Sequence, residues 1–353
     1  MIKVAFFPCL AATKAGQPIK ALAWAATMAV CLLFPFAAVA DPITLKLSFF
    51  SSNRSMSYNA AVKPFVDAVN ADSSGLVQIK VYFSGALGKD IAQQPQLLLD
   101  GAFDIAFIVP GYTPDQFPDN PIMELPGPFR DMRESTFVYT QLVALNALRG
   151  YEDFFVIGAY VSNPETIHGR TAINSIDDLK GKRIRVNNQS ESSMFEKLGA
   201  TPVPLPVNQI SEAISSKAID AAAIALTPLS DYGIKRVVTH HYLLGTSGAP
   251  LALLMNRKSF GALPPAAQDI IRKYSGEWAA TQFIDAYSAS DSKVIEQLKS
   301  DPQRTLVYPS QRDLDIAHSA FEAVTAEWSA KSSHYRDLLN LVATRTAKLR
   351  SSN

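Results

Sequence analysis

Cysteine is nearly absent from this sequence. The chain has only Cys9 and Cys31, and both lie within residues 1–40. If that segment is removed, the rest of the chain can form no disulfide bond and has no thiolate for catalysis or for metal binding. Its stability must then come from a hydrophobic core, which residues 41–353 are numerous enough to build.

An excess of charge of either sign is also missing. The chain has 33 Lys and Arg against 32 Asp and Glu, which gives a formal net charge of +1. Loss of residues 1–40 removes three lysines and no acidic residue, so the net charge falls by three, from +1 to −2. Nucleic acid and anionic lipid are bound by basic surfaces, so neither is predicted as a partner.

Patterns for catalysis and for metal binding are missing as well. None of the five histidines lies in a zinc-protease motif, and His240 and His241 are neighbours on a predicted strand, so their side chains point to opposite faces. Residues 85–89 are too few for a phosphate-binding loop, and residues 245–248 lack the frame of a nucleophile elbow. The sequence therefore predicts no enzyme, no cofactor and no metal.

Residues 1–40 have the pattern of a secretory signal. Three lysines are their only charged residues, and an apolar run ends in Ala38-Val39-Ala40. This pattern predicts a signal peptide over residues 1–40 and a periplasmic mature protein. The alternative is an uncleaved membrane anchor, because the uncharged residues 21–40 form a run of about 20 residues that could just span a bilayer.

The rest of the chain alternates predicted strands with predicted helices, which indicates the α/β class with mostly parallel sheets. The predicted strands are residues 43–50, 76–83, 104–109, 154–161, 183–186, 219–224 and 251–256. The predicted helices are residues 56–70, 94–101, 190–198, 208–218, 265 to about 300, and 311 to about 349. The two series predict two lobes that close like a clamp, with the ligand beyond the carboxyl ends of the strands.

Four groups of residues resemble the substrate-binding subunit of tripartite ATP-independent periplasmic (TRAP) transporters, of the DctP type. They are residues 100–107 with 110–114 and 123–129; 176–186; 198–206 with 218–220; and 254–256 with 263–264. The resemblance implies a two-lobed periplasmic binding protein with a long helix across both lobes. Lobe I would hold residues 41–162 and about 251–290, and lobe II residues 163–250 and about 291–353.

The resemblance also implies a function and a set of partners. Such a protein captures a small organic carboxylate in the periplasm and delivers it to the small and large membrane subunits of a TRAP transporter. The long C-terminal helix offers a surface for a homodimer. Two alternatives stay open: a binding protein of the same ligand chemistry that serves a sensor kinase, and a periplasmic hydrolase or isomerase, for which no acid–base pair is found.

In this family the arginine of an I-R-V strand binds the ligand carboxylate, and here that arginine is Arg185. A guanidinium suits this role, because it is planar, always charged and able to pair both carboxylate oxygens. Arg183 shares the face of the strand but is farther from its carboxyl end, so we predict a surface charge there.

Further predicted site residues follow from the topology. They are Phe49, Phe50, Pro110, Tyr112, Glu165 and Asn187, all at the carboxyl ends of predicted strands. Asn187 shares the face of Arg185, and Tyr112 is expected to stack on the ligand or donate to it, unless it is an exposed loop tyrosine. For Glu165 a ligand contact and a surface position both stay open, and the surface is favoured.

One segment departs from the family pattern. Most members have a glycine and polar residues after the Ile-Asp that is Ile219-Asp220 here, whereas residues 221–228 are Ala-Ala-Ala-Ile-Ala-Leu-Thr-Pro. Ile224 and Leu226 are the large side chains of this apolar wall. We therefore expect a monocarboxylate with an apolar body, such as an aromatic, branched-chain or keto acid, rather than a short dicarboxylate.

Overall fold

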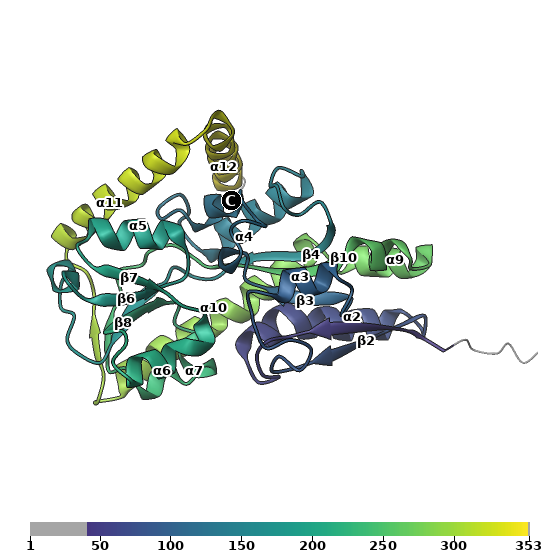
Figure 1. Cartoon of the computed structure of the whole chain (residues 1–353), viewed down its shortest axis with the longest axis horizontal. Coiled ribbons are helices and arrows are strands. Elements are labelled where there is room, and N and C mark those ends of the chain that lie inside the picture. Colours follow the sequence, from purple (N-terminus) through teal and green to yellow (C-terminus); the bar gives the residue numbers. More distant parts are fainter. Residues whose placement is uncertain (1–40, 352–353) are drawn as a thin grey trace, which may run out of the picture. The chain divides into compact units, whose positions relative to one another are not determined.

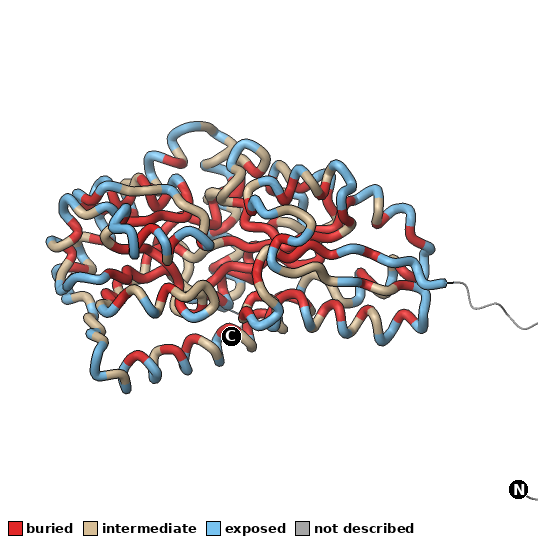
Figure 2. The backbone as a smooth tube through the Cα atoms, turned by 60° about the horizontal axis from the view of Figure 1, so that its bottom comes forward, coloured by how far each residue is buried: buried red, intermediate tan, exposed pale blue. Residues whose placement is uncertain are grey.

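The structure is a computed structural model, and it describes residues 41–351. The predicted signal peptide lies outside the described residues. Strands and helices alternate along the chain and form two sheets, each covered by helices (Figure 1). Buried stretches follow the strands, with exposed positions concentrated on the outer helices (Figure 2).

The first sheet has five strands in the order β2-β1-β3-β10-β4. Their bounds are β1 Ile43–Ser48, β2 Val77–Tyr82, β3 Ile105–Ile108, β4 Phe154–Val161 and β10 Pro250–Asn256. Strands β2, β1 and β3 are parallel, as predicted, but β10 is antiparallel to both β3 and β4. The sheet is mixed because β10 returns to it from the second sheet.

The second sheet has six strands in the order β11-β9-β5-β8-β6-β7. Their bounds are β5 Thr166–Gly169, β6 Arg183–Val186, β7 Thr201–Pro204, β8 Ala221–Ile224, β9 His240–Tyr242 and β11 Thr305–Val307. Strand β6 is parallel to β7 and β8, whereas β5 is antiparallel to β8 and β9. The two sheets with their helices confirm the predicted α/β class with two lobes.

The helices cover both sheets. Their bounds are α2 Lys63–Asp72, α3 Gln94–Leu99, α4 Met132–Ala144, α5 Gln189–Lys197, α6 Ile210–Ser215, α7 Pro228–Asp231, α8 Arg257–Gly261, α9 Pro265–Lys273, α10 Glu277–Ser300, α11 Gln311–Ala330 and α12 Ser333–Ser351. Helix α10 contacts β4 of the first sheet and β11 of the second, so it runs along both lobes, as expected (Figure 1).

Two long predicted helices are each divided in the structure. The predicted helix after residue 265 is α9 and α10, separated at Gly276, whose φ of +63° interrupts the helical backbone. The predicted helix from residue 311 is α11 and α12. Helix α11 packs on α5 of the second lobe and α12 on α4 of the first, so the break lets this hairpin contact both lobes.

Helix α4 was not predicted, although its start has a sequence signal. The Asp131 side chain accepts a hydrogen bond from the Glu134 backbone N–H, 2.8 Å away, and Glu134 Oε2 accepts one from the Arg130 N–H. An N-cap residue followed three positions later by Glu is the signature of a helix start.

Helix α11 begins with a capping box, in which Ser310 and Asp313 each accept a hydrogen bond from the other's backbone N–H. We expect Ser310→Ala to lower the free energy of unfolding by about 1 kcal/mol, because one N–H at the helix start loses its acceptor. Urea denaturation measures the change. Ser319→Ala, at an exposed position within the same helix, is the control and is not expected to destabilise. Equal losses in the two variants would contradict the role of the cap.

Candidate functional site

A buried cavity lies where the two sheets meet, and elements of both lobes line it. Phe50, Phe107 and Tyr112 come from the ends of strands or the turns after them in the first lobe, and Arg185 and Ile224 come from β6 and β8 of the second. The enclosed space is about 50 Å³. The lobes therefore lie closed on each other, and the carboxyl ends of the strands face the cavity, as the rule for open α/β sheets requires.

Arg185 is the cation of this cavity, and it is 1% exposed. Four N–H groups of its guanidinium donate to protein acceptors. They bind the Leu205 carbonyl at 2.9 Å, the Ala223 carbonyl at 2.8 Å, and the Tyr112 hydroxyl and Asn187 Oδ1 at 3.1 Å each. These bonds fix the guanidinium against the floor of the cavity, so a ligand meets a pre-oriented positive charge.

Two polar side chains beside Arg185 have unused hydrogen-bonding capacity. The Tyr112 oxygen accepts from Arg185 and from the Val207 backbone N–H, 3.0 Å away, so its own hydrogen is left to donate. Asn187 Nδ2 is buried and, among residues 41–351, has no hydrogen-bond partner. A buried amide without a partner costs free energy, so it indicates a place for a polar group of a ligand.

Three buried carboxyl groups lie near one another at this site: Glu165 and Glu191 beside Arg185, and Glu124 near these two. Glu165 Oε2 lies 3.7 Å from Arg185 Nη1. Burial raises the pKa of Glu165, and the neighbouring charge of Glu191 raises it further. Burial also raises the pKa of Glu191, although the Asn187 N–H opposes this, and it raises the pKa of Glu124 to about 8. Arg185 is the one permanent cation of the cavity wall, and more than one buried carboxyl group lies near it.

The rest of the wall is apolar and aromatic. Its members are Phe50, Phe107, Val109, Val207, Ile224, Ala225, Leu251, Tyr232 and Tyr287. Phe50 and Phe107 lie with ring centroids 5.8 Å apart. A ligand that reaches Arg185 therefore has its charged end on the guanidinium and its body against hydrocarbon.

Six of the predicted site residues line the cavity together: Phe50, Tyr112, Glu165, Arg185, Asn187 and Ile224. The favoured surface position of Glu165 is wrong, because the residue is 3% exposed. Its loop is covered by the segment that holds Ser247 and Thr246, to which its backbone is hydrogen bonded. Arg183, by contrast, is exposed and pairs with Asp220, as predicted for a surface charge.

Three predicted site residues do not line the cavity. Phe49 alternates with Phe50 and packs into the core against Phe107, with ring centroids 5.5 Å apart. Pro110 is buried at the start of the 3-10 turn Pro110–Tyr112. Leu226 lies beyond the end of β8, where strand alternation no longer sets the direction of a side chain, and it packs half-buried against the core.

Several cavity residues were not predicted. Tyr287 comes from α10 and donates to or accepts from the Ser57 hydroxyl at 2.8 Å, and Tyr232 follows α7. No local pattern in the sequence distinguishes these tyrosines from core residues, because they reach the cavity only through long-range packing.

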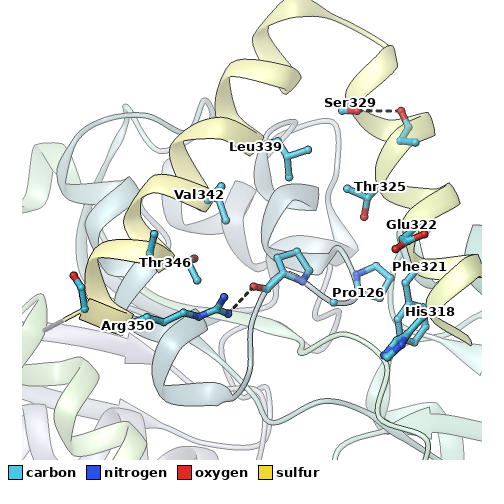
Figure 3. A pocket seen from close by; sticks show the side chains of 16 residues that line it. Pro126, His318, Phe321, Glu322, Thr325, Ser329, Leu339, Val342, Thr346 and Arg350 are labelled. Atoms are coloured by element: carbon cyan, nitrogen blue, oxygen red, sulfur yellow. Dashed lines mark hydrogen bonds between the residues drawn. The ribbon is translucent and has the colours of Figure 1, made fainter. Parts of the chain in front are cut away.

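A larger hollow of about 950 Å³ lies between α11, α12 and the segment Pro126–Pro128 (Figure 3). Arg350 at the end of α12 closes one side, where it donates to the Pro128 carbonyl at 3.3 Å and pairs with Glu134. Leu339, Val342 and Phe321 face the hollow in Figure 3. It is an open groove between two surface helices. Thr346 Oγ1 in its wall is buried and, among residues 41–351, has no hydrogen-bond partner, but the charged side chains that line the groove are all exposed. The cavity at Arg185, which holds a buried cation, is therefore the candidate ligand site.

Two α/β lobes closed over a cavity with a fixed cation define a solute-binding protein of the two-lobed class. The sequence matches the family described as bacterial extracellular solute-binding protein, family 7, over residues 47–332. The chain belongs to this family, the substrate-binding subunits of TRAP transporters, which bind substrates for transport. The family assignment from the sequence is thereby confirmed.

Relatives of known name have limited identity but long coverage. The sialic acid-binding periplasmic protein SiaP of Vibrio cholerae is 28% identical over 320 residues, which are 86% of this chain and 94% of that protein. The C4-dicarboxylate-binding protein DctB of Bacillus subtilis is 25% identical over 277 residues, which are 74% of this chain and 75% of that protein.

Solved structures have the same fold. A TRAP solute-binding protein from Rhodoferax ferrireducens T118, in complex with copurified benzoate, has a TM-score of 0.81 and 25% identity, and covers 88% of this chain and 99% of its own. A marine metagenome TRAP solute-binding protein specific for aromatic acids, with 3-hydroxybenzoate, has a TM-score of 0.80 at 23% identity and the same coverage of both chains.

Residues 41–351 lack two features that would point to another kind of protein. None of the helices in this part of the chain is both long and apolar enough to cross a membrane. The same residues contain no group of three or more His, Cys, Asp and Glu side chains arranged to hold a metal ion.

Proposed function

We propose that this protein captures a small organic carboxylate at Arg185 and delivers it to the membrane subunits of a TRAP transporter. The observation that carries the proposal is a buried guanidinium in an apolar cavity, next to the unpartnered Nδ2 of Asn187. A carboxylate supplies the negative charge that this cation attracts and the acceptor that the amide lacks. The remaining Tyr112 hydrogen supplies a second donor.

The ligand has one carboxylate and an apolar body, most simply an aromatic acid. A second carboxylate at the far end of the ligand would contact Phe50, Phe107 and Ile224. These side chains offer no hydrogen bonds to offset the free-energy cost of removing that carboxylate from water. The structural relatives with benzoate and 3-hydroxybenzoate support the same ligand class.

The remaining parts of the proposal follow from the family. Its members SiaP and YiaO are periplasmic binding proteins, which supports a periplasmic location here and a signal peptide at residues 1–40. Capture and release need no bond-making step, so the protein acts without being an enzyme. We assign residues 41–162 with about 251–290 to one lobe and residues 163–250 with about 291–353 to the other, an assignment that the strands of the two sheets support. A homodimer through the C-terminal helices α11 and α12 stays a prediction, which analytical ultracentrifugation would test.

A thermal-shift panel tests the ligand class. Benzoate, mandelate, a branched keto acid and succinate are compared with benzylamine, which has the body of benzoate and the opposite charge. A ligand at about a hundred times its dissociation constant adds on the order of 2.7 kcal/mol to the free energy of unfolding, a shift of several degrees. We expect the largest shift with an aromatic or keto monocarboxylate and none with benzylamine. A succinate shift as large as any other would contradict the apolar-body proposal, and no shift with any carboxylate would contradict carboxylate capture.

A further inference from the structure

Glu165 and Arg185 are the two charged side chains of the cavity wall. The Glu165 side chain is 4% exposed, and its Oε2 lies 3.7 Å from Arg185 Nη1, beyond hydrogen-bonding distance. Within the part of the chain that the structure describes, this oxygen has no hydrogen-bond partner. An ionised carboxylate at this position therefore lacks the hydrogen bonds that a buried charge requires.

The groups that face Glu165 come from four elements. They are Arg185 of β6, Glu191 of α5, Glu124 of the 3-10 turn Asn120–Glu124 and Tyr112 of the turn after β3. Two carboxyl groups, Glu165 and Glu191, thus lie near one guanidinium, and Glu124 lies near them, before any ligand adds its own negative charge. Ionisation of all of them beside a bound carboxylate would leave a large uncompensated charge in a closed cavity.

Glu191 is better placed than Glu165 to stay ionised. Its Oε2 accepts from the Asn187 backbone N–H at 2.8 Å, and its Oε1 accepts from the Thr246 hydroxyl at 3.2 Å. It also lies in the first turn of α5, where the helix dipole favours a negative charge. When Glu165 and Glu191 together hold one proton, Glu165 is therefore the group that is protonated.

We propose that Glu165 takes up one proton when a carboxylate binds, so that the ligand carboxylate lies beside a neutral carboxyl next to Arg185. The proposal deepens the proposed function and rests on it, since it concerns the same cavity. Protonation removes the repulsion between Glu165 and the ligand carboxylate, and the neutral carboxyl can donate its hydrogen to the neighbouring carboxylate of Glu191. Glu165 is thus a specificity residue that favours an anion over an amine next to Arg185.

The proton comes from water when the lobes move. Arg185 and Glu165 are almost fully buried, so a ligand reaches them only after the lobes separate. Separation exposes Glu165 to water, where a carboxyl is ionised at neutral pH. Closure on a carboxylate then buries the group, and it binds a proton from the solvent.

The sign of the pH dependence follows from this exchange. The bound state holds one more proton than the free state at any pH between the pKa of Glu165 in the open form and its higher pKa in the closed complex. Ligand affinity is therefore expected to fall as the pH rises through this window, by up to about tenfold per pH unit.

Isothermal titration calorimetry tests the proposal with benzoate, or with the carboxylate that gives the largest thermal shift in the panel. Binding is measured at pH 7 in phosphate and in Tris, because these buffers differ in ionisation enthalpy. The dependence of the observed enthalpy on the buffer gives the number of protons bound, which is expected to be about one. In Glu165→Gln, which keeps the size and a donor, we expect binding without proton uptake and an affinity that is constant between pH 6 and pH 8.

Glu196→Gln is the control variant, since it removes an exposed carboxyl of α5 outside the cavity and is expected to leave the proton uptake in place. Wild-type binding without proton uptake would overturn the proposal, and so would proton uptake that persists in Glu165→Gln. The wild-type experiment needs no variant, so a folding defect in Glu165→Gln does not remove the test. If no carboxylate binds at all, both the proposed function and the inference of proton uptake are wrong. If a carboxylate binds without uptake of a proton, only the inference of proton uptake is wrong.

Discussion

Replacement of Arg185 by alanine is expected to weaken carboxylate binding by at least about 100-fold. Loss of one partner from a buried, hydrogen-bonded charge pair costs about 2–5 kcal/mol, which corresponds to about 30-fold to several thousand-fold in affinity. Arg185 belongs in the upper part of this range, because it is 1% exposed and is the one permanent cation of the cavity wall. Titration calorimetry of wild type and variant with the same carboxylate measures the loss.

Two further variants separate the role of the charge from that of the fold. Arg185→Lys keeps the positive charge but loses the planar fork, so we expect an intermediate loss of about tenfold. Arg183→Ala is the matched control, two residues earlier on the same strand, where the side chain is 44% exposed and pairs with Asp220 at the surface. Its affinity is expected to stay within about twofold of wild type, because exposed ion pairs contribute little. Equal affinity in Arg185→Ala and wild type would exclude Arg185 as the ligand residue.

The parts of the fold that could be predicted are those in which neighbouring residues determine the structure. Strand β4 has the predicted bounds Phe154–Val161, and β6 has the predicted bounds Arg183–Val186, because short apolar runs between turns read directly as strands. The prediction of one helix after residue 311 was wrong, since nothing in the local pattern marks the turn at residues 331–332. That turn is fixed by packing of α11 on α5 and of α12 on α4, which are distant in sequence.

Some residues of the candidate site could be predicted from neighbouring residues, whereas others depend on distant segments of the chain. Arg185 and Asn187 could be placed because strand alternation puts them on one face. The burial of Glu165 could not be predicted, because it depends on the segment around Thr246, which covers its loop from about 80 residues away in the sequence. Strand alternation also puts the side chains of Phe49 and Phe50 on opposite faces of the sheet, so the core position of Phe49 could have been predicted from the sequence.

The second large effect concerns stability and falls on Asp119, a buried carboxylate outside the cavity. Asp119 is 0% exposed and joins three segments. Its oxygens accept from the Arg149 backbone N–H at 2.8 Å, from Arg149 Nη2 at 2.6 Å and from His334 Nε2, at the start of α12, at 2.9 Å. Burial alone would raise the pKa of Asp119, but the bonds from Arg149 and His334 outweigh it and lower the pKa below its usual value.

Asp119→Asn is therefore expected to lower the free energy of unfolding by about 2–3 kcal/mol at pH 7, because charge-assisted hydrogen bonds are lost. A carboxylate with a lowered pKa stabilises the fold above its pKa in the unfolded chain, and this stabilisation is lost as the pH falls through its pKa in the folded chain. The difference between wild type and variant should thus shrink between pH 5 and pH 3, which urea denaturation at several pH values measures. Asp115→Asn, four residues earlier and exposed, should change the stability by less than about 0.5 kcal/mol at every pH. A difference for Asp119→Asn that stays constant down to pH 3 would show that lost packing, rather than the lost charge, causes the effect.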